Sequence, residues 1–245
     1  MSLPRSVRVA SFELGGTVLD AERGLVEAVH HTLGECDPAR LRLLAAARAD
    51  VELERIEELE EYVPYAELLA ETLLSAALRA GVTITAEQAR TVAATLPDWP
   101  FFDDALPALE RIAARFPVAF VTNADRADWE RIAHRLPFRA ARAVTSSDVL
   151  CYEPEADHLL ALLHELELDE EELLHVSAHG ELDLATAEDL GIPRAYLDRS
   201  GEPLPEEVTA LVTVKTMTEL ADWMLAAPPP ARRRAAPRRT RGESR

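Results

Sequence analysis

The stretch Phe12-Glu13-Leu14-Gly15-Gly16-Thr17 decides the fold, because an apolar segment ends here and small and polar residues follow at once. Residues 7–12 read Val-Arg-Val-Ala-Ser-Phe, an alternating and then apolar run that predicts a β-strand. A carboxylate and two glycines directly after such a strand are typical of a loop that faces a ligand. We therefore expect the first strand to end at a functional loop.

Further short apolar segments predict five more strands, at residues 118–121, 143–145, 173–176, 194–197 and 210–214. Helical patterns lie between them at residues 105–115, 127–136, 154–166 and 183–190. Such alternation predicts an α/β fold, a doubly wound parallel sheet covered by helices on both faces. Any ligand site is then expected at the carboxyl edge of the sheet.

Residues 21–97 interrupt this alternation, because their pattern is helical throughout. Leu53, Ile56 and Leu59 define an apolar helix face, opposite the acidic residues Glu54, Glu57, Glu58 and Glu61. We interpret the acidic run as a solvated helix face rather than a binding patch.

Three later motifs join the first one: Thr122-Asn123, Ser147 to Pro154 and Ser177 to Asp183. In this order the four motifs resemble those of the haloacid dehalogenase-like (HAD) superfamily. The resemblance covers nearly all of residues 7–225, and it implies a Rossmann-like α/β core with an inserted all-helical cap of the C1 type. It places the core at residues 1–20 and 98–227 and the cap at 21–97. We expect residues 228–245, rich in arginine and proline, to be a disordered tail.

The first motif departs from the family pattern at its reactive positions. In the family the first strand ends in Asp-x-Asp-x-Thr, and the first aspartate is the nucleophile. Glu13 and Gly15 stand at the two aspartate positions, while Thr17 keeps the threonine. The extra methylene of Glu13 moves its carboxylate outward, and a misplacement of about 1 Å can cost on the order of 10²-fold in rate.

The third and fourth motifs also depart from the pattern. Glu153 stands where the family has a lysine, and Ala178 stands at the first acid of the fourth motif. Thr122 and Asp183 remain as in the family. These changes predict an eroded active site without ordinary phosphatase or dehalogenase activity, in a protein retained for binding or assembly. The alternative is a HAD-type hydrolase of a small phosphate ester or 2-haloacid whose altered machinery uses Glu13.

The charge of the predicted site is unusual. If Glu13, Glu153 and Asp183 converge to about 5 Å, each pair costs roughly 3 kcal/mol at an effective dielectric near 20. Such a pocket stays ionised only around a cation, and otherwise one carboxyl keeps its proton. Two alternatives remain open: Glu153 turns outward to solvent, or Asp183 is a helix N-cap.

The resemblance also supplies the other candidate site residues. Glu13 is the candidate catalytic group, and Glu13 and Asp183 are candidate ligands for Mg²⁺, the candidate cofactor. The candidate ligand-binding residues are Gly15, Thr17, Thr122, Asn123, Glu153, Ser177 and His179. A serine-hydrolase triad drawn from His175, Ser177, His179 and Asp183 is disfavoured, because no Gly-x-Ser-x-Gly elbow accompanies these residues.

The composition of the chain disfavours some classes of binding partner but identifies none. The net charge of −18 includes +6 on residues 228–245, so residues 1–227 carry −24, which disfavours nucleic acid and anionic membranes. Cys36 and Cys151 lie far apart and are interpreted as free thiols. The N-terminal residues lack the pattern of a signal peptide, so we expect a cytoplasmic location. Neither a small-molecule ligand nor a partner protein can be named from the sequence.

Overall fold

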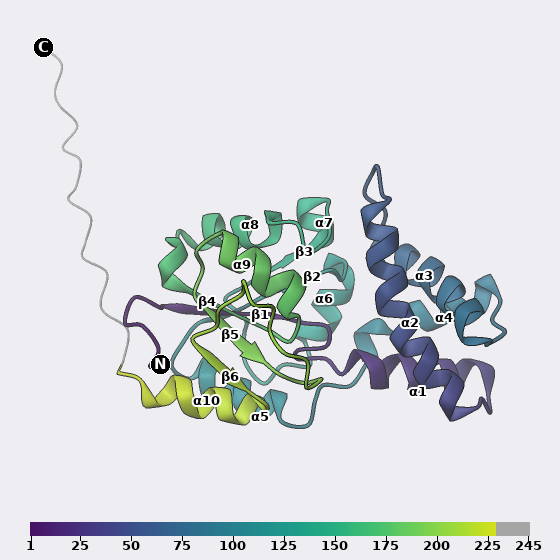
Figure 1. The fold of residues 1–245 in the computed structure, drawn as a ribbon, viewed down its shortest axis with the longest axis horizontal. Helices are drawn as coiled ribbons and strands as arrows, with labels where there is room; N and C mark the ends of the chain where they lie inside the picture. The colour runs from purple at the N-terminus through teal and green to yellow at the C-terminus, as the bar shows by residue number, and fades with distance from the viewer. Residues whose placement is uncertain (229–245) are drawn as a thin grey trace, which may run out of the picture.

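A six-stranded parallel sheet organises the chain in the computed structural model, which describes residues 1–228 (Figure 1). The strands are β1 (Val9–Glu13), β2 (Val118–Thr122), β3 (Arg142–Thr145), β4 (Leu173–Ser177), β5 (Arg194–Leu197) and β6 (Val212–Val214). Their order is β3-β2-β1-β4-β5-β6, and every pair is parallel. The six predicted strands are therefore confirmed. The predicted tail lies outside the described residues from position 229 onward.

Helices cover both faces of the sheet because successive strand residues point to opposite sides. Phe12 and Phe120 enter the core beneath α5 (Ala105–Ala113) and α10 (Met217–Ala226). Val121 and its neighbours enter a second core beneath α8 (Asp157–Leu166) and α9 (Ala185–Asp189). Two further helices, α6 (Arg126–Ala133) and α7 (Ser146–Val149), follow β2 and β3. The predicted doubly wound, Rossmann-like α/β fold is confirmed.

Residues 21–93, called the helical block here, form four helices beside the sheet (Figure 1). They are α1 (Ala21–Leu33), α2 (Pro38–Glu57), α3 (Tyr65–Ala80) and α4 (Ala86–Ala93). The block has its own core, in which Leu44, Leu68 and Leu73 are fully buried. The four acidic residues of the predicted solvated face are exposed, as expected. The division of the chain into core and cap stays a prediction.

The segment that enters the helical block and the segment that leaves it run side by side. Leu19 and Phe101 form an isolated antiparallel bridge. Beside it, the Asp20 N–H donates to the Pro100 carbonyl at 2.9 Å, and the Phe102 N–H donates to the Val18 carbonyl at 3.1 Å. The entering and leaving segments are thus held together by backbone hydrogen bonds.

A second attachment, called the Asp125 clasp here, lies after β2. The Tyr62 hydroxyl donates to Asp125 Oδ1 at 2.6 Å, and the Ala66 N–H donates to Asp125 Oδ2 at 3.3 Å. The Tyr152 hydroxyl adds a hydrogen bond to the Val63 carbonyl. The helical block is therefore fastened to the sheet at two separate places. Within residues 1–228, no helix has the length and apolar character needed to span a membrane.

Gly24 allows α1 to lie directly against Trp99, a buried residue at the end of the block. A Cβ at position 24 would lie 2.4 Å from Trp99 Cγ. The Trp99 indole cannot easily move, because its Nε1–H donates to Thr95 Oγ1 at 3.0 Å.

We therefore predict that Gly24→Ala lowers the free energy of unfolding by about 1–3 kcal/mol, the usual cost of overpacking. In an open helix position the same change would stabilise by about 1 kcal/mol. Urea unfolding measures the effect. In a Trp99→Leu background the cost should shrink, because the smaller side chain leaves room for the methyl group. An equal cost in both backgrounds would contradict the steric explanation.

Candidate functional site

The ends of β1, β2 and β4 lie side by side at one edge of the sheet. Glu13 pairs with Val121 of β2, and Phe12 pairs with Val176 of β4. Glu13, Thr122 and Ser177 are consequently adjacent strand-end residues. The sheet order changes direction at β1 and β4, and such a switch point is where α/β sheets bind ligands.

A cavity of about 590 Å³ lies over this edge, between the strand ends and the helical block. The predicted site residues that line it are Glu13, Gly15, Thr122, Asn123, Glu153, His179 and Asp183. Thr17 and Ser177 do not line the cavity, and they hold the surrounding loops instead. The structure thus brings most of the predicted residues together, while their roles in binding stay predictions.

Glu13 ends β1 with its carboxyl group almost out of water, since the residue is only 7% exposed. The Gly15 N–H donates to Glu13 Oε1 at 2.8 Å. Glu13 Oε2 is buried and has no hydrogen-bond partner within the described part of the chain. Burial, and next the charge of Asp183, raise the pKa of Glu13 well above its ordinary value. The carboxyl therefore holds its proton to a higher pH than a glutamate in water.

Asp183 belongs to one turn of π-helix, Gly180–Leu184, that precedes α9. The interpretation of Asp183 as a helix N-cap is wrong, because Leu184 holds that position and makes no side-chain capping bond. The Ser177 hydroxyl instead donates to Asp183 Oδ2 at 2.5 Å and accepts from the His179 N–H at 2.9 Å. Burial is the main cause that raises the pKa of Asp183.

The first and fourth loops are tied to each other. The Ala178 N–H donates to Thr17 Oγ1 at 2.9 Å, and His179 Nε2 lies 3.0 Å from the Gly15 carbonyl oxygen. A Cβ on Gly16 would lie 2.8 Å from His179 Nε2, and Gly16 has a φ of +77°. Glycine at this position therefore allows both the turn and the contact between the two loops.

Glu153 lines the cavity instead of turning outward, so this alternative does not describe the structure. Its N–H donates to Asn123 Oδ1 at 2.8 Å, which holds the loop after α7 against the end of β2. Burial raises the pKa of Glu153 well above its ordinary value, and the charges of Asp183 and Glu13 add to this effect. The three acids therefore oppose one another's ionisation.

Thr122 and Asn123 use their side-chain oxygens inside the protein. Thr122 Oγ1 accepts from the Ala124 N–H at 3.1 Å. Asn123 Oδ1 accepts from the Glu153 N–H and, at 3.3 Å, from the Ser146 hydroxyl. Their predicted part in ligand binding stays a prediction.

The residues present do not make a fitting site for Mg²⁺. Among residues 1–228, no group of three or more histidine, cysteine, aspartate or glutamate side chains could hold a metal ion. Ala178 supplies no ligand where the family pattern has an acid. The Mg²⁺ ligands predicted at Glu13 and Asp183 stay a prediction without support from this donor set, and no chemical step is derived from a metal.

The helical block contributes a buried network that the sequence did not reveal. Arg48 forms an ion pair with Glu52, and the Tyr65 hydroxyl donates to Glu52 Oε1 at 3.0 Å. All three residues line the cavity. The i,i+4 spacing of Arg48 and Glu52 could have indicated the pair, but the acidic residues that follow Glu52 pointed to solvent.

A second ion pair supports the opposite wall. Arg199 donates to both oxygens of Asp104, at 3.0 Å and 2.9 Å, and its guanidinium lies 4.1 Å from the centre of the Phe102 ring. Asp104 also accepts from the Met217 N–H at 2.7 Å. Arg199 and Phe102 line the cavity, so this pair fixes part of its wall.

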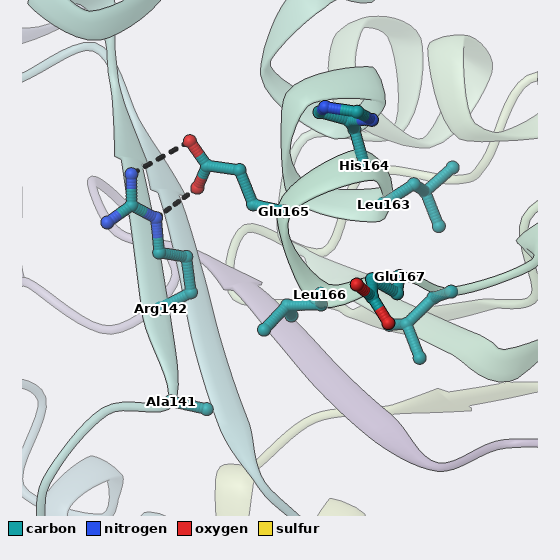
Figure 2. A pocket seen from close by; sticks show the side chains of 8 residues that line it. Ala141, Arg142, Leu163, His164, Glu165, Leu166 and Glu167 are labelled. Carbon is teal, nitrogen blue, oxygen red and sulfur yellow. Dashed lines mark hydrogen bonds and ion pairs between the residues drawn. The ribbon is translucent and has the colours of Figure 1, made fainter.

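A larger hollow of about 800 Å³ lies elsewhere, between the start of β3 and the end of α8. Figure 2 shows Arg142 and Glu165 joined across it by two hydrogen bonds. Because it lies at the amino end of β3, it is away from the carboxyl edge where ligand sites of this fold occur. We therefore assign the functional site to the smaller cavity.

Comparison with known proteins agrees with this geometry. A family model described as haloacid dehalogenase-like hydrolase matches residues 7–191. No curated protein sequence is significantly similar to the chain.

Solved structures of dehalogenases are similar in fold. The structure of a defluorinating L-2-haloacid dehalogenase has a TM-score of 0.75 and 20% identity, covering 92% of this chain and 99% of its own. A dehalogenase with an intermediate complex has a TM-score of 0.76 and 22% identity, covering 88% and 96%. The L-2-haloacid dehalogenase from Xanthobacter autotrophicus with covalently bound chloropropionic acid has a TM-score of 0.77 and 15% identity, covering 91% and 100%.

The raised pKa of Glu13 makes stability depend on pH. The unfolded chain loses this proton near the ordinary pKa of 4.5, whereas the folded chain keeps it to higher pH. The folded state therefore binds more protons above that value, and the free energy of unfolding falls as pH rises.

We predict that Glu13→Gln removes this loss. The variant should be more stable than the natural chain at neutral pH, and the difference should vanish below about pH 4. Each kcal/mol gained corresponds to about 2–4 °C in melting temperature for a domain of this size. Thermal unfolding across pH measures it, with Glu155→Gln at an exposed position as the control. A constant difference at all pH values would refute the assignment.

Proposed function

We propose that this chain, which belongs to the haloacid dehalogenase-like hydrolase family, is a binding protein without ordinary phosphatase or dehalogenase activity. The observation that carries the proposal is the state of Glu13. A nucleophilic carboxyl must be ionised, but burial raises the pKa of Glu13 and favours its protonated form. One of its oxygens is also engaged by the Gly15 N–H at 2.8 Å.

The residues that line the cavity also include no unpaired lysine or arginine for an anionic substrate. Glu153 stands where the family pattern has lysine. The chain's single lysine, Lys215, is paired with Asp198 at 3.6 Å and does not line the cavity. The two arginines that line it, Arg48 and Arg199, are each in an ion pair with a carboxylate. A phosphate or carboxylate substrate would therefore meet net repulsion.

In this proposal the helical block serves as the C1-type cap. It carries Arg48, Glu52 and Tyr65 on the wall that faces the strand ends. Two attachments, the crossing at Leu19 and Phe101 and the Asp125 clasp, hold it over the cavity. A ligand would thus be enclosed between the two parts of the chain.

The alternative function is a hydrolase with altered machinery. One observation favours it: Glu13 still places a carboxyl group in the cavity at the end of β1. Similar structures include a dehalogenase with chloropropionic acid covalently bound. The substrate in this alternative is a small phosphate ester or a 2-haloacid, and Glu13 would have to ionise before it attacks.

A turnover assay separates the two functions. The purified chain is incubated with an aryl phosphate and Mg²⁺, and separately with 2-chloropropionate, beside Glu13→Ala. We expect neither protein to release phosphate or chloride above the uncatalysed rate. Turnover that is lost in Glu13→Ala would establish the alternative.

We further predict that the four family residues can be restored. Glu13→Asp, Gly15→Asp, Glu153→Lys and Ala178→Asp together should raise aryl phosphate hydrolysis in Mg²⁺ by about 10²-fold or more, because they return the nucleophile, the second acid, the cation and the first metal acid. The matched control carries Glu13→Asn with the other three changes and should stay inactive. A folded quadruple variant without activity would show that the backbone of the site has also changed.

A further inference from the structure

We infer that the cavity over the strand ends binds a small organic cation, an amine whose ammonium group lies against Glu13, Glu153 and Asp183 and whose apolar body lies against the helical block. This inference rests on the proposed binding function, since it names the class of ligand for the same cavity. Three observations support it: the charge of the cavity walls, a buried acceptor of Glu13 without a partner, and the size and chemistry of the walls.

The charge of the cavity walls favours a cation. The acidic residues among them are Glu13, Asp20, Glu22, Glu52, Glu153 and Asp183. The basic residues are Arg48, Arg199 and His179. The ion pairs with Glu52 and Asp104 neutralise the two arginines, and the positive charge of His179 offsets part of the charge of Asp183. Glu13 and Glu153 are left at the strand ends without a basic partner among the lining residues. A positively charged ligand would favour the ionised form of these two acids over the protonated form and would supply their counter-charge.

Glu13 presents an acceptor that lacks a donor. Its Oε2 atom is buried without a hydrogen-bond partner in residues 1–228, and the residue is 7% exposed. The Gly15 N–H donates to the other oxygen, Oε1, at 2.8 Å. A buried acceptor without a partner destabilises a protein, so a ligand that donates a hydrogen bond here is favoured. An ammonium group carries both the donor and the charge.

The size and chemistry of the walls favour an organic ligand. The volume of about 590 Å³ lies within the range of about 300–1,000 Å³ for small-molecule sites. Leu25, Leu53, Ile56 and Trp99 line it from the helical block and its return segment. A bare metal ion would leave this apolar surface empty, and residues 1–228 contain no group of three or more histidine, cysteine, aspartate or glutamate side chains that could hold one. An ammonium on an apolar body matches both ends of the cavity.

Three probes of nearly equal shape test the inference: phenethylammonium, 2-phenylethanol and phenylacetate. Isothermal titration calorimetry on the full chain measures their affinities at neutral pH. We expect phenethylammonium to bind about tenfold or more tightly than the alcohol, and phenylacetate to show no binding. A competition with CaCl₂ should leave the affinity for phenethylammonium nearly unchanged.

Variants locate the contact. Glu13→Gln and Glu153→Gln should each weaken phenethylammonium by about tenfold and leave 2-phenylethanol unchanged. Glu155→Gln removes the same charge from an exposed position two residues away and should bind as the natural chain does. The melting temperature of each variant shows that it is folded.

Several outcomes would overturn the inference. They are equal or tighter binding of the alcohol or phenylacetate, no binding of any probe, displacement by calcium, or unchanged affinity in both glutamine variants. If any of these occurs and the enzyme assay shows no turnover, the inference of a cationic ligand is wrong, and the proposed binding function still stands. Turnover that depends on Glu13 removes the proposed function, whatever the probes do.

Discussion

The parallel pairing of β1 between β2 and β4 is the constraint on which the site depends. It places three strand ends at one edge and points their loops toward the same cavity. Thr17 and His179 then join the first loop to the fourth, and Asn123 joins the second to the third. The site is therefore held by the sheet and by hydrogen bonds between loops.

The fold of this chain and the charge of its cavity point to different functions. The fold is that of a hydrolase family, whereas the cavity here gathers acids whose pKa values are raised by burial and by neighbouring acids. The scaffold does not require the chemistry, because function resides in the side chains placed on a fold. Arg48 and Arg199 do not restore the balance, since each is paired with its own carboxylate.

The sequence predicted the strands well because strands buried on both faces are written as short, nearly continuous apolar runs. It placed Glu13 at the functional edge of the sheet, but it left open whether Glu153 faces the cavity or the solvent, because a loop sequence does not fix the direction of its side chains. It did not predict Glu52, because a buried glutamate beside an acidic run looks like its exposed neighbours. The π-helical turn that holds Asp183 leaves no local signal, so an ordinary helix start was expected instead.

The Asp125 clasp has a consequence for how the cavity exchanges its contents. Burial raises the pKa of Tyr62 and of Tyr152, so both hydroxyls stay protonated throughout the physiological range. These hydroxyls therefore keep donating to Asp125 and Val63 as the pH rises. A body fastened at two points can swing only about the line that joins them. For the proposed ligand to enter or leave, either these bonds would have to break or the helical block would have to pivot about them, and neither step needs the loss of a tyrosine proton.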